Sequence, residues 1–301
     1  MRENPFRKIY DSKEYKEVLL HRDKPAEFPY LIDIELTNYC NLKCLFCFAA
    51  QAMTREKGFI DRKIFKKVID ECAIHNTPVR FIRWGEPFLH PQIISFVRYL
   101  KSRGLLLHIT NNGLAITKKQ MEAMIDLGLD SIIFSFQGAT KEEYQRMRDN
   151  QRYNDLVKNI ETLIKLRGKK EKPFISITST MYQDSEEDIK KFKEHWERIV
   201  DFVGIGKTRI FWTPARLTKI FPKDIRPCTE VYQKLSIDWD GKVTACCGDY
   251  DRFLTVGDIN RNTLQEIWKG EELKAVRTLL DKKLHRNLTL CKTCEHAYQG
   301  F

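Results

Sequence analysis

The sequence contains no long hydrophobic run. No apolar stretch approaches the roughly 18 residues that a membrane-spanning helix requires, and the N-terminal segment MRENPFRKIYDSKEYKEVLL is charged throughout, without the apolar core of a signal peptide. We therefore expect a cytoplasmic protein with no membrane partner. Its nine cysteines should then be reduced and available to metal, and their odd number argues against a complete disulfide framework.

The sequence also lacks an arginine-rich tract, an aromatic–basic RNA-binding motif, an internal repeat and a low-complexity segment. These absences disfavour nucleic acid as a partner. The 52 Lys and Arg residues against 41 Asp and Glu give a formal net charge of +11, which favours an anionic partner such as an acidic substrate or an acidic redox protein. A solvated basic surface with no special partner explains the same charge.

Short β-branched or aromatic runs alternate with helical patterns from about residue 31 to residue 212. The expected strands are residues 31–37, 79–84, 105–110, 131–136, 174–180 and 209–213. Two of the intervening helices follow a residue that can cap an N-terminus, Asp61 in one case and Ser185 in the other. Six such repeats predict an α/β protein with a parallel sheet and outer helices, either an open doubly wound sheet or an incomplete barrel.

Chemically distinctive segments follow the expected strands. CNLKCLFC (40–47) follows the first strand, GEP (85–87) follows the second, TNNG (110–113) spans the end of the third, and QG (137–138) follows the fourth. In both kinds of parallel fold, functional groups gather just beyond the carboxyl ends of the strands. The sequence therefore predicts a site at this edge of the sheet.

The segment CNLKCLFC has one cysteine fewer than the common metal sites need. Cys40, Cys44 and Cys47 are close together, and the next cysteine, Cys72, lies 25 residues further on in an apolar helical stripe that predicts a core position. A structural zinc site uses four protein ligands, and an ordinary four-iron cluster uses four cysteines. A ligand from outside this segment must complete the set.

The pattern changes after Pro214. Residues 215–228 contain two prolines and scattered charges and are typical of a linker, and residues 235–247 predict a hairpin that turns at Asp240-Gly241. Thr263 and Glu266 form a capping-box pattern that opens a helix over residues 263–280, and the chain then reaches CKTC (291–294). This part holds five of the nine cysteines and predicts a small metal-stapled module.

A Cys-x3-Cys-x2-Cys loop after the first strand of a βα array resembles the radical S-adenosylmethionine (SAM) superfamily. The resemblance implies that Cys40, Cys44 and Cys47 bind three irons of a [4Fe–4S] cluster, while SAM binds the fourth iron through its amino and carboxylate groups. Reductive cleavage of SAM then yields a 5′-deoxyadenosyl radical that abstracts hydrogen from the substrate. The fold that the resemblance implies is an incomplete (β/α)6 TIM-like barrel.

The resemblance extends to residues that bind SAM in this family. Phe46 matches the aromatic residue before the third cysteine, which packs near the adenine. The segment Trp84-Gly85-Glu86-Pro87 resembles the Gly-Gly-Glu-Pro segment that binds the amino group of SAM, although Trp84 stands where the first glycine is usual. Positions at which the family places contacts to the ribose and carboxylate of SAM are occupied by Asn111, Ser135 and Gln137.

The C-terminal cysteines resemble those of a shortened SPASM domain, the "twitch" variant. Cys228 is followed after twelve residues by Gly241 and after four more by Cys246, as at the opening of that domain. Four thiols, Cys228, Cys246, Cys291 and Cys294, imply one auxiliary [4Fe–4S] cluster, and a zinc knuckle is the alternative. The expected domains are an N-terminal extension (1–30), a radical SAM core (31–213) and an auxiliary-cluster module (214–301).

An auxiliary cluster beside the substrate can accept the second electron of an oxidation. The resemblance therefore implies an oxidoreductase that oxidises an alcohol of a sugar, an amino sugar or a nucleotide-linked sugar. Fewer than 40 residues precede the cysteine loop, too few for the leader-binding domain of many peptide-modifying relatives, and this favours a small polar substrate. A flavodoxin or ferredoxin is the expected reductant.

Other functions stay open at this point. One is epimerisation of a sugar or peptide, in which Cys247 donates a hydrogen atom to the substrate radical because its thiol is not among the expected ligands. Another is modification of a peptide by a different radical reaction. The non-enzyme alternative is a basic, zinc-stapled module that binds nucleic acid or an acidic protein.

Overall fold

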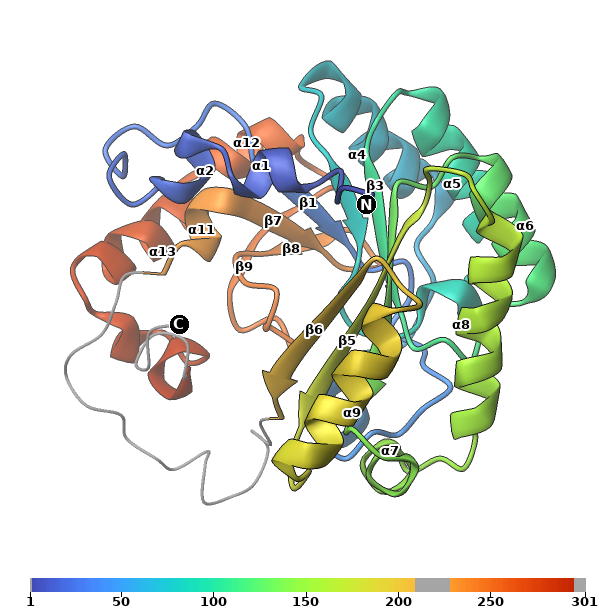
Figure 1. The fold of residues 1–301 in the computed structure, drawn as a ribbon. Coiled ribbons are helices and arrows are strands. Elements are labelled where there is room, and N and C mark those ends of the chain that lie inside the picture. Colours follow the sequence, from blue (N-terminus) through green and yellow to red (C-terminus); the bar gives the residue numbers. More distant parts are fainter. Residues whose placement is uncertain (1, 209–227, 295–301) are drawn as a thin grey trace.

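The computed structural model describes residues 2–208 and 228–294, and these form one curved nine-stranded sheet with helices around it (Figure 1). The strand order is β6-β5-β4-β3-β2-β1-β7-β8-β9. The strands are β1 (Leu31–Ile34), β2 (Val79–Phe81), β3 (Leu107–Asn111), β4 (Ser131–Gln137), β5 (Phe174–Met181), β6 (Phe202–Lys207), β7 (Lys234–Ile237), β8 (Lys242–Thr244) and β9 (Thr255–Asp258). Neighbours from β6 through β1 to β7 are parallel, and only the last two pairs are antiparallel.

Helices alternate with the parallel strands and lie on the outer side of the sheet (Figure 1). The cap predictions are confirmed, because Asp61 accepts a hydrogen bond from the backbone amide of Lys63 and Ser185 accepts one from Asp188. The fold is therefore the predicted α/β class, an incomplete TIM-like barrel. The main helices are α4 (Arg62–Ile74), α5 (Ile93–Ser102), α6 (Lys118–Asp126), α7 (Lys141–Arg148), α8 (Tyr153–Arg167) and α9 (Glu186–Glu197).

The sixth strand of the barrel is β6, which the sequence did not predict. The strand expected at residues 209–213 and the linker after it lie outside the described residues. Strand β6 has the sequence FVGIGK, and Gly204 and Gly206 interrupt the β-branched pattern that marks the other strands. The glycines face β5 closely, since a Cβ atom on Gly204 would lie 3.3 Å from Cγ2 of Thr178.

The C-terminal part continues the sheet of the core. Strand β7 pairs in parallel with β1, and the predicted hairpin follows it through Asp240 and Gly241, whose φ of 90° suits glycine. The expected helix over residues 263–280 is interrupted. Thr263 and Glu266 form the predicted capping box at the start of α12 (Leu264–Lys269), but Gly270 is extended (φ −69°, ψ 157°), and a second helix, α13 (Glu271–Asp281), begins after it.

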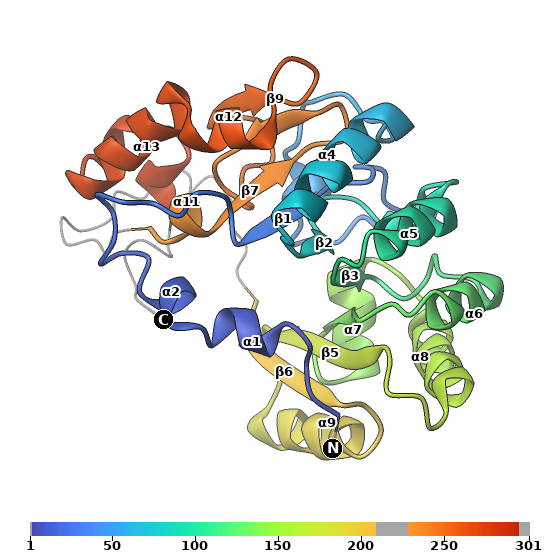
Figure 2. The same cartoon turned by 90° about the horizontal axis from the view of Figure 1, so that it is seen from above.

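The N-terminal segment crosses the amino-terminal end of the open barrel (Figure 2). It carries the short helices α1 (Arg7–Tyr10) and α2 (Lys13–Lys16). Near β7 the carbonyl of Tyr15 accepts a hydrogen bond from Gln233, and further along Phe6 packs edge-on against His108 of β3. In the described part of the chain, no helix combines the length and the apolar character needed to cross a membrane.

The two faces of the sheet differ in polarity. Side chains such as Ile32 and Ile34 of β1 face the helices and join the main hydrophobic core. The alternate positions face the interior of the half-barrel, and there Asp33 forms an ion pair of 2.6 Å with Arg80. Hydroxyl groups occupy several of the other interior positions on β3, β4 and β5. They belong to Thr110, Ser131, Ser135, Ser176, Thr178 and Thr180. The interior of the half-barrel is therefore more polar than the face that packs against the helices.

Candidate active site

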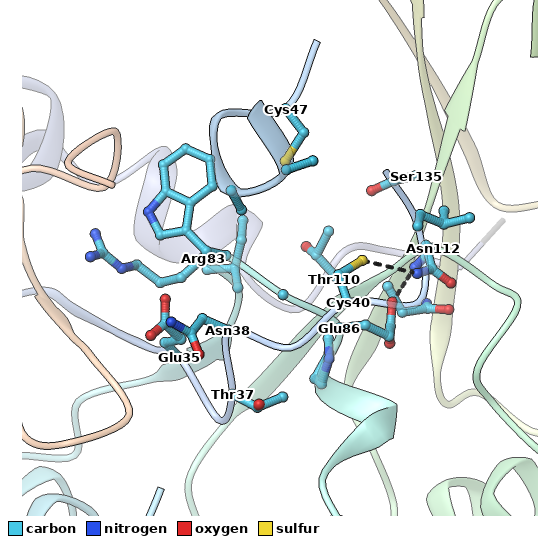
Figure 3. Close-up of a pocket in the computed structure, with 18 of the residues that line it drawn as sticks. Glu35, Thr37, Asn38, Cys40, Cys47, Arg83, Glu86, Thr110, Asn112 and Ser135 are labelled. Atoms are coloured by element: carbon cyan, nitrogen blue, oxygen red, sulfur yellow. Dashed lines mark hydrogen bonds between the residues drawn. The ribbon is translucent and has the colours of Figure 1, made fainter. Parts of the chain in front are cut away.

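A cavity of about 470 Å³ lies at the carboxyl ends of β1 to β4, where the sequence predicted a site (Figure 3). All three cysteines of the predicted cluster loop line it, together with the segment 83–87 after β2 and Thr110 at the end of β3. Glu35 and Arg83 lie at one end of the cavity, and Asn112 and Ser135 lie at the other. The volume falls in the range of small-molecule and cofactor sites.

The cysteine loop presents three thiols with different exposure. Cys44 is buried, Cys47 is half-buried and Cys40 belongs to an exposed stretch of the loop. Although the residue as a whole is exposed, partial removal of its thiol from water raises the pKa of Cys40 to about 11, with smaller contributions from Glu86, Cys44 and Cys47, and burial also raises the pKa of Cys47. The three thiols are thus close enough to repel one another as thiolates. A bound cation would relieve that repulsion, and binding would release protons.

Gly85 and Glu86 hold the loop to the end of β2. The amide of Glu86 donates to the carbonyl of Tyr39, next to Cys40, at 2.8 Å. Gly85 has φ +81°, and a Cβ atom there would lie 2.2 Å from the carbonyl oxygen of Thr37. Only glycine therefore permits this contact. Pro87 lies beside them in the cavity wall and begins a short 3-10 helix, η1 (Pro87–Leu89).

Glu86 is buried and joins the end of β2 to that of β3. Its carboxylate accepts hydrogen bonds from the backbone amides of Phe88 (3.0 Å) and Asn112 (2.7 Å). Burial raises the pKa of Glu86 to about 7, despite these two bonds. The side chain therefore fixes the backbone of two loops beside the cysteines and is close to its protonation midpoint at neutral pH.

The two asparagines of TNNG have different roles. The side chain of Asn111 binds backbone groups, donating to the carbonyl of Ile133 and accepting from the amide of Gly113. Asn112 instead faces the cysteine loop, where Nδ2 donates to Asn41 Oδ1 at 2.7 Å and lies 3.8 Å from Sγ of Cys40. Sequence analysis singled out Asn111, which does line the cavity, but missed Asn112.

Ser135 and Gln137 of β4 differ in the same way. Ser135 lines the cavity. Gln137 is fully buried, and its amide donates to the carbonyl of Thr180 and to Oγ1 of Thr208, both at 2.7 Å. Gln137 is not among the described residues that line the cavity. Its role as a SAM contact stays a prediction.

Arg148, at the end of α7, is a cavity residue that sequence analysis missed. Its guanidinium lies 5.4 Å from the ring centroid of Phe46, and Nη2 donates to the carbonyls of Ser135 (2.5 Å) and Phe136 (3.2 Å). Nε is buried and has no hydrogen-bond partner within the described residues. A buried, partly unpaired guanidinium beside a cavity favours an anionic ligand group. The carboxylate of SAM provides such a group.

The four remaining candidate ligands come from three separate segments that the fold brings together. Cys228 precedes α11 (Glu230–Gln233), Cys246 follows β8, and CKTC forms the short helix η3 (Cys291–Thr293). Burial raises the pKa of Cys228 and of Cys291 to about 12. A hydrogen bond with Cys247 and burial raise the pKa of Cys246, with a smaller contribution from Cys228, and Cys294 contributes to the raised pKa of Cys228, so the thiols are electrostatic neighbours.

Cys247, the hydrogen donor of the epimerase alternative, lies in a turn after β8. The amide of Asp249 donates to the carbonyl of Cys246, so both cysteines belong to a turn. The Cys247 thiol lies 3.1 Å from Oε2 of Glu230, and Cys247 is not among the described residues that line the cavity. A hydrogen bond with Cys246 lowers the pKa of Cys247.

The number of thiols in each group matches what an iron–sulfur cluster needs. Within residues 2–208 and 228–294, no three His, Cys, Asp or Glu side chains converge as they would around one metal ion. A four-iron cluster has a different requirement, because each thiolate binds a different iron and the sulfurs surround the cluster. The three-thiol loop beside a cavity fits a cluster with one iron open to a ligand, and the four thiols of the module fit a fully ligated cluster.

An incomplete βα barrel with three thiols at its carboxyl edge and a second set of thiols in an appended module defines an iron–sulfur enzyme. The family model described as the radical SAM superfamily matches residues 34–206, and a model described as an iron–sulfur cluster-binding domain, SPASM, matches residues 228–295. The chain therefore belongs to the radical SAM superfamily. Its cofactors are SAM, the radical SAM [4Fe–4S] cluster and an auxiliary iron–sulfur cluster, as predicted.

Known proteins that resemble this chain differ in the reactions that their names describe. It is 20% identical to the SAM-dependent 2-deoxy-scyllo-inosamine dehydrogenase of Niallia circulans over 88% of this chain and 92% of that protein. It is 35% identical to the tungsten-containing aldehyde ferredoxin oxidoreductase cofactor-modifying protein of Pyrococcus furiosus, but over only 34% of this chain and 29% of that protein. The structure of Streptococcus suis SuiB bound to precursor peptide SuiA superposes with a TM-score of 0.70 at 17% identity, covering 98% of this chain and 77% of SuiB.

Proposed function

We propose that this enzyme oxidises an alcohol of a small polyhydroxylated substrate, of the sugar, amino sugar or nucleotide-linked sugar class. The observation that carries the proposal is the full-length similarity to a dehydrogenase whose name specifies an amino-cyclitol substrate. The polar interior of the half-barrel supports it, because Thr110 and Ser135 present hydroxyl groups beside the cavity. Such groups can donate to and accept from the hydroxyls of a sugar.

When bound, SAM and the clusters supply the radical that abstracts hydrogen and an acceptor for the remaining electron. Overall, the oxidation removes a hydrogen atom from the carbinol carbon, a proton from its hydroxyl group and one electron. The protein's own residues hold the reacting groups. Cys40, Cys44 and Cys47 would bind the first cluster, Arg148 would bind the SAM carboxylate, and Glu86 fixes the neighbouring loop at Asn112.

The ligands of the auxiliary cluster are, in this proposal, Cys228, Cys246, Cys291 and Cys294. The position of Cys247 supports oxidation over epimerisation, since its thiol contacts Glu230 and is not a cavity residue. The electron donor is a flavodoxin or ferredoxin, whose acidic surface would complement the net charge of +11. The proposed domain division is 1–30, 31–213 and 214–301.

The test is anaerobic incubation of the reconstituted enzyme with reductant, SAM and a panel of sugars, amino sugars and amino-cyclitols. Oxidation predicts one 5′-deoxyadenosine per product and a product two mass units lighter than the substrate. Incorporation of solvent deuterium at the product carbon without a change in oxidation state would indicate an epimerase instead. Cys247→Ala separates the two reactions, because a dehydrogenase keeps its turnover in this variant and an epimerase loses the inverted product.

A further inference from the structure

Two consecutive side chains of the core, Arg83 and Trp84, reach into the C-terminal module. Nη1 of Arg83 donates to the carbonyl of Cys246 at 2.9 Å, and Nη2 donates to the carbonyl of Asp249 at 3.2 Å. Nε1 of Trp84 donates to the same Asp249 carbonyl at 3.2 Å. Cys246 and Asp249 are the first and last residues of the turn after β8, so these side chains hold both of its ends.

The contact is buried and specific. The Arg83 side chain is completely buried and forms an ion pair of 2.6 Å with Asp238. Burial opposes the charge on Arg83, but Asp238 and Glu35, with a smaller contribution from Cys247, together outweigh this effect and the pKa of Arg83 is raised. The backbone of Arg83 has φ +135°, a strained conformation that non-glycine residues rarely adopt. Such strain persists only where surrounding contacts fix the residue, and here the contacts belong to the module.

Aromatic packing continues the same contact. Phe48, directly after the third cysteine of the cluster loop, stacks on Tyr250 with ring centroids 4.5 Å apart and planes 10° apart. Trp84 meets both rings edge-on, at 6.2 and 6.3 Å. Nε of Arg55 donates to the carbonyl of Tyr250 at 2.8 Å. The chain just after Cys47 is therefore joined to the chain just after Cys246.

We propose that Arg83 and Trp84 are positioning residues for the auxiliary cluster. They fix the turn that presents Cys246, and they do so from the five-residue segment 83–87 that also lines the cavity and holds the first cysteine loop. The orientation of a ligand in the module thus depends on the wall of the SAM cavity. The inference rests on the proposed function in one respect, that Cys246 is a ligand of the auxiliary cluster.

The buried guanidinium also has an electrostatic effect. Reduction adds negative charge to a cluster, and a fixed cation close to a ligand favours the reduced state. Replacing Arg83 by Gln keeps a side chain that can donate a hydrogen bond but removes the charge. We expect the reduction equilibrium of the auxiliary cluster to shift toward the oxidised state roughly tenfold, which is about 59 mV for a one-electron couple.

The experiment is a potentiometric titration of the full chain, reconstituted anaerobically and followed by electron paramagnetic resonance. Replacing Cys40, Cys44 and Cys47 by Ala in every sample leaves only the auxiliary cluster to report. Arg83→Gln should lower its potential. The matched control is Arg252→Gln, because Arg252 also pairs with Asp238, at 2.8 Å, but in the described part of the chain it makes no hydrogen bond to the Cys246 carbonyl. It should leave the potential unchanged.

Trp84→Phe provides a second variant, since it retains an aromatic ring but loses the N–H group that binds Asp249, together with part of the ring area. This variant should lower the potential of the auxiliary cluster by a smaller amount than Arg83→Gln does, or change the spectrum of that cluster. Loss of module iron in Arg83→Gln but not in Arg252→Gln also supports the inference. Unchanged potentials in Arg83→Gln and Trp84→Phe, with the module iron present, would overturn this inference but not the proposed ligand set. Absence of iron from the parent protein would overturn the proposed ligand set as well.

Discussion

Nη1 of Arg148 lies 3.6 Å from Sγ of Cys44, in a buried position on the wall of the cavity. The same guanidinium fixes two carbonyls of β4, so its position is set by the barrel and not by the cysteine loop. Its positive charge beside the cavity makes it suited to an anionic ligand group.

We expect Arg148→Met to raise the KM for SAM by roughly tenfold or more, which corresponds to the loss of one charge-assisted hydrogen bond. Arg148→Lys keeps the charge and should retain part of the affinity. The measurement is the rate of 5′-deoxyadenosine formation against SAM concentration, with iron content determined for each variant. An unchanged KM in Arg148→Met with full iron content would show that SAM does not use this group.

Replacing Cys40, Cys44 or Cys47 by Ala should abolish SAM cleavage while the protein still folds, because the loop follows a strand end and lies outside the main core. Circular dichroism checks that each variant folds, and 5′-deoxyadenosine formation together with iron content checks the loss of cleavage. Cys72→Ala is the comparison, since Cys72 is completely buried in α4 and should affect stability and not cleavage. Retained cleavage in all three loop variants would contradict the ligand assignment.

Cys291→Ala or Cys294→Ala should remove about half of the iron and leave some uncoupled SAM cleavage. The two cysteine sets come from separate segments, so each cluster should assemble without the other. Iron analysis and 5′-deoxyadenosine formation without product measure the outcome. Full iron content in both variants would mean that other residues bind the auxiliary cluster.

Two glycines with similar backbone conformations allow a matched comparison. Gly85 and Gly104 have φ of +81° and +77°, but a Cβ atom on Gly104 would meet no atom within 4 Å. Gly104→Ala should therefore cost only the backbone strain, about 1 kcal/mol in the free energy of unfolding. Gly85→Ala should cost more and lower the iron content of the first cluster, because it pushes against the carbonyl of Thr37. Equal effects of the two substitutions would argue against this close contact.

The stability of the protein should depend on His108 at mildly acidic pH. Burial, together with the nearby Arg80, lowers the pKa of His108 from 6.5 to about 3. Below pH 6.5 the unfolded chain binds a proton at this position that the folded protein does not, so stability falls as the pH falls, by about 1.4 kcal/mol per unit. The free energy of unfolding, measured with urea between pH 7 and pH 5, should depend less steeply on pH in His108→Gln than in the wild type. The exposed His21→Gln serves as the control, and equal slopes in wild type and His108→Gln would contradict the assignment.

Local patterns were sufficient to predict the cysteine loop and the elements next to it. The spacing of Cys40, Cys44 and Cys47 and the caps at Asp61 and Ser185 lie within short stretches of chain, and the structure retains them. Strand β6 was missed because Gly204 and Gly206 carry no side chain to mark a strand. Their suitability depends on the threonines of β5, which come much earlier in the sequence.

Functional contacts between distant residues could not be read from the sequence. Arg148 lies 104 positions from Cys44, and no local pattern separates it from the other arginines. Trp84 was visible as a departure from the family's glycine. Its partner could not be predicted, because the indole N–H of Trp84 donates to the carbonyl of Asp249, which lies 165 positions away.

The parallel pairing of β1 with β7 has a consequence for the synthesis of the chain. Strand β1 lies in the interior of the sheet, yet Leu31 to Ile34 find one set of partners only at Lys234 to Ile237. Until those residues leave the ribosome, one edge of β1 stays unpaired in a nascent chain that already contains the rest of the barrel. Exposed strand edges of this kind promote association between chains. Truncation before residue 234 should therefore give an aggregating product and not a smaller independent barrel.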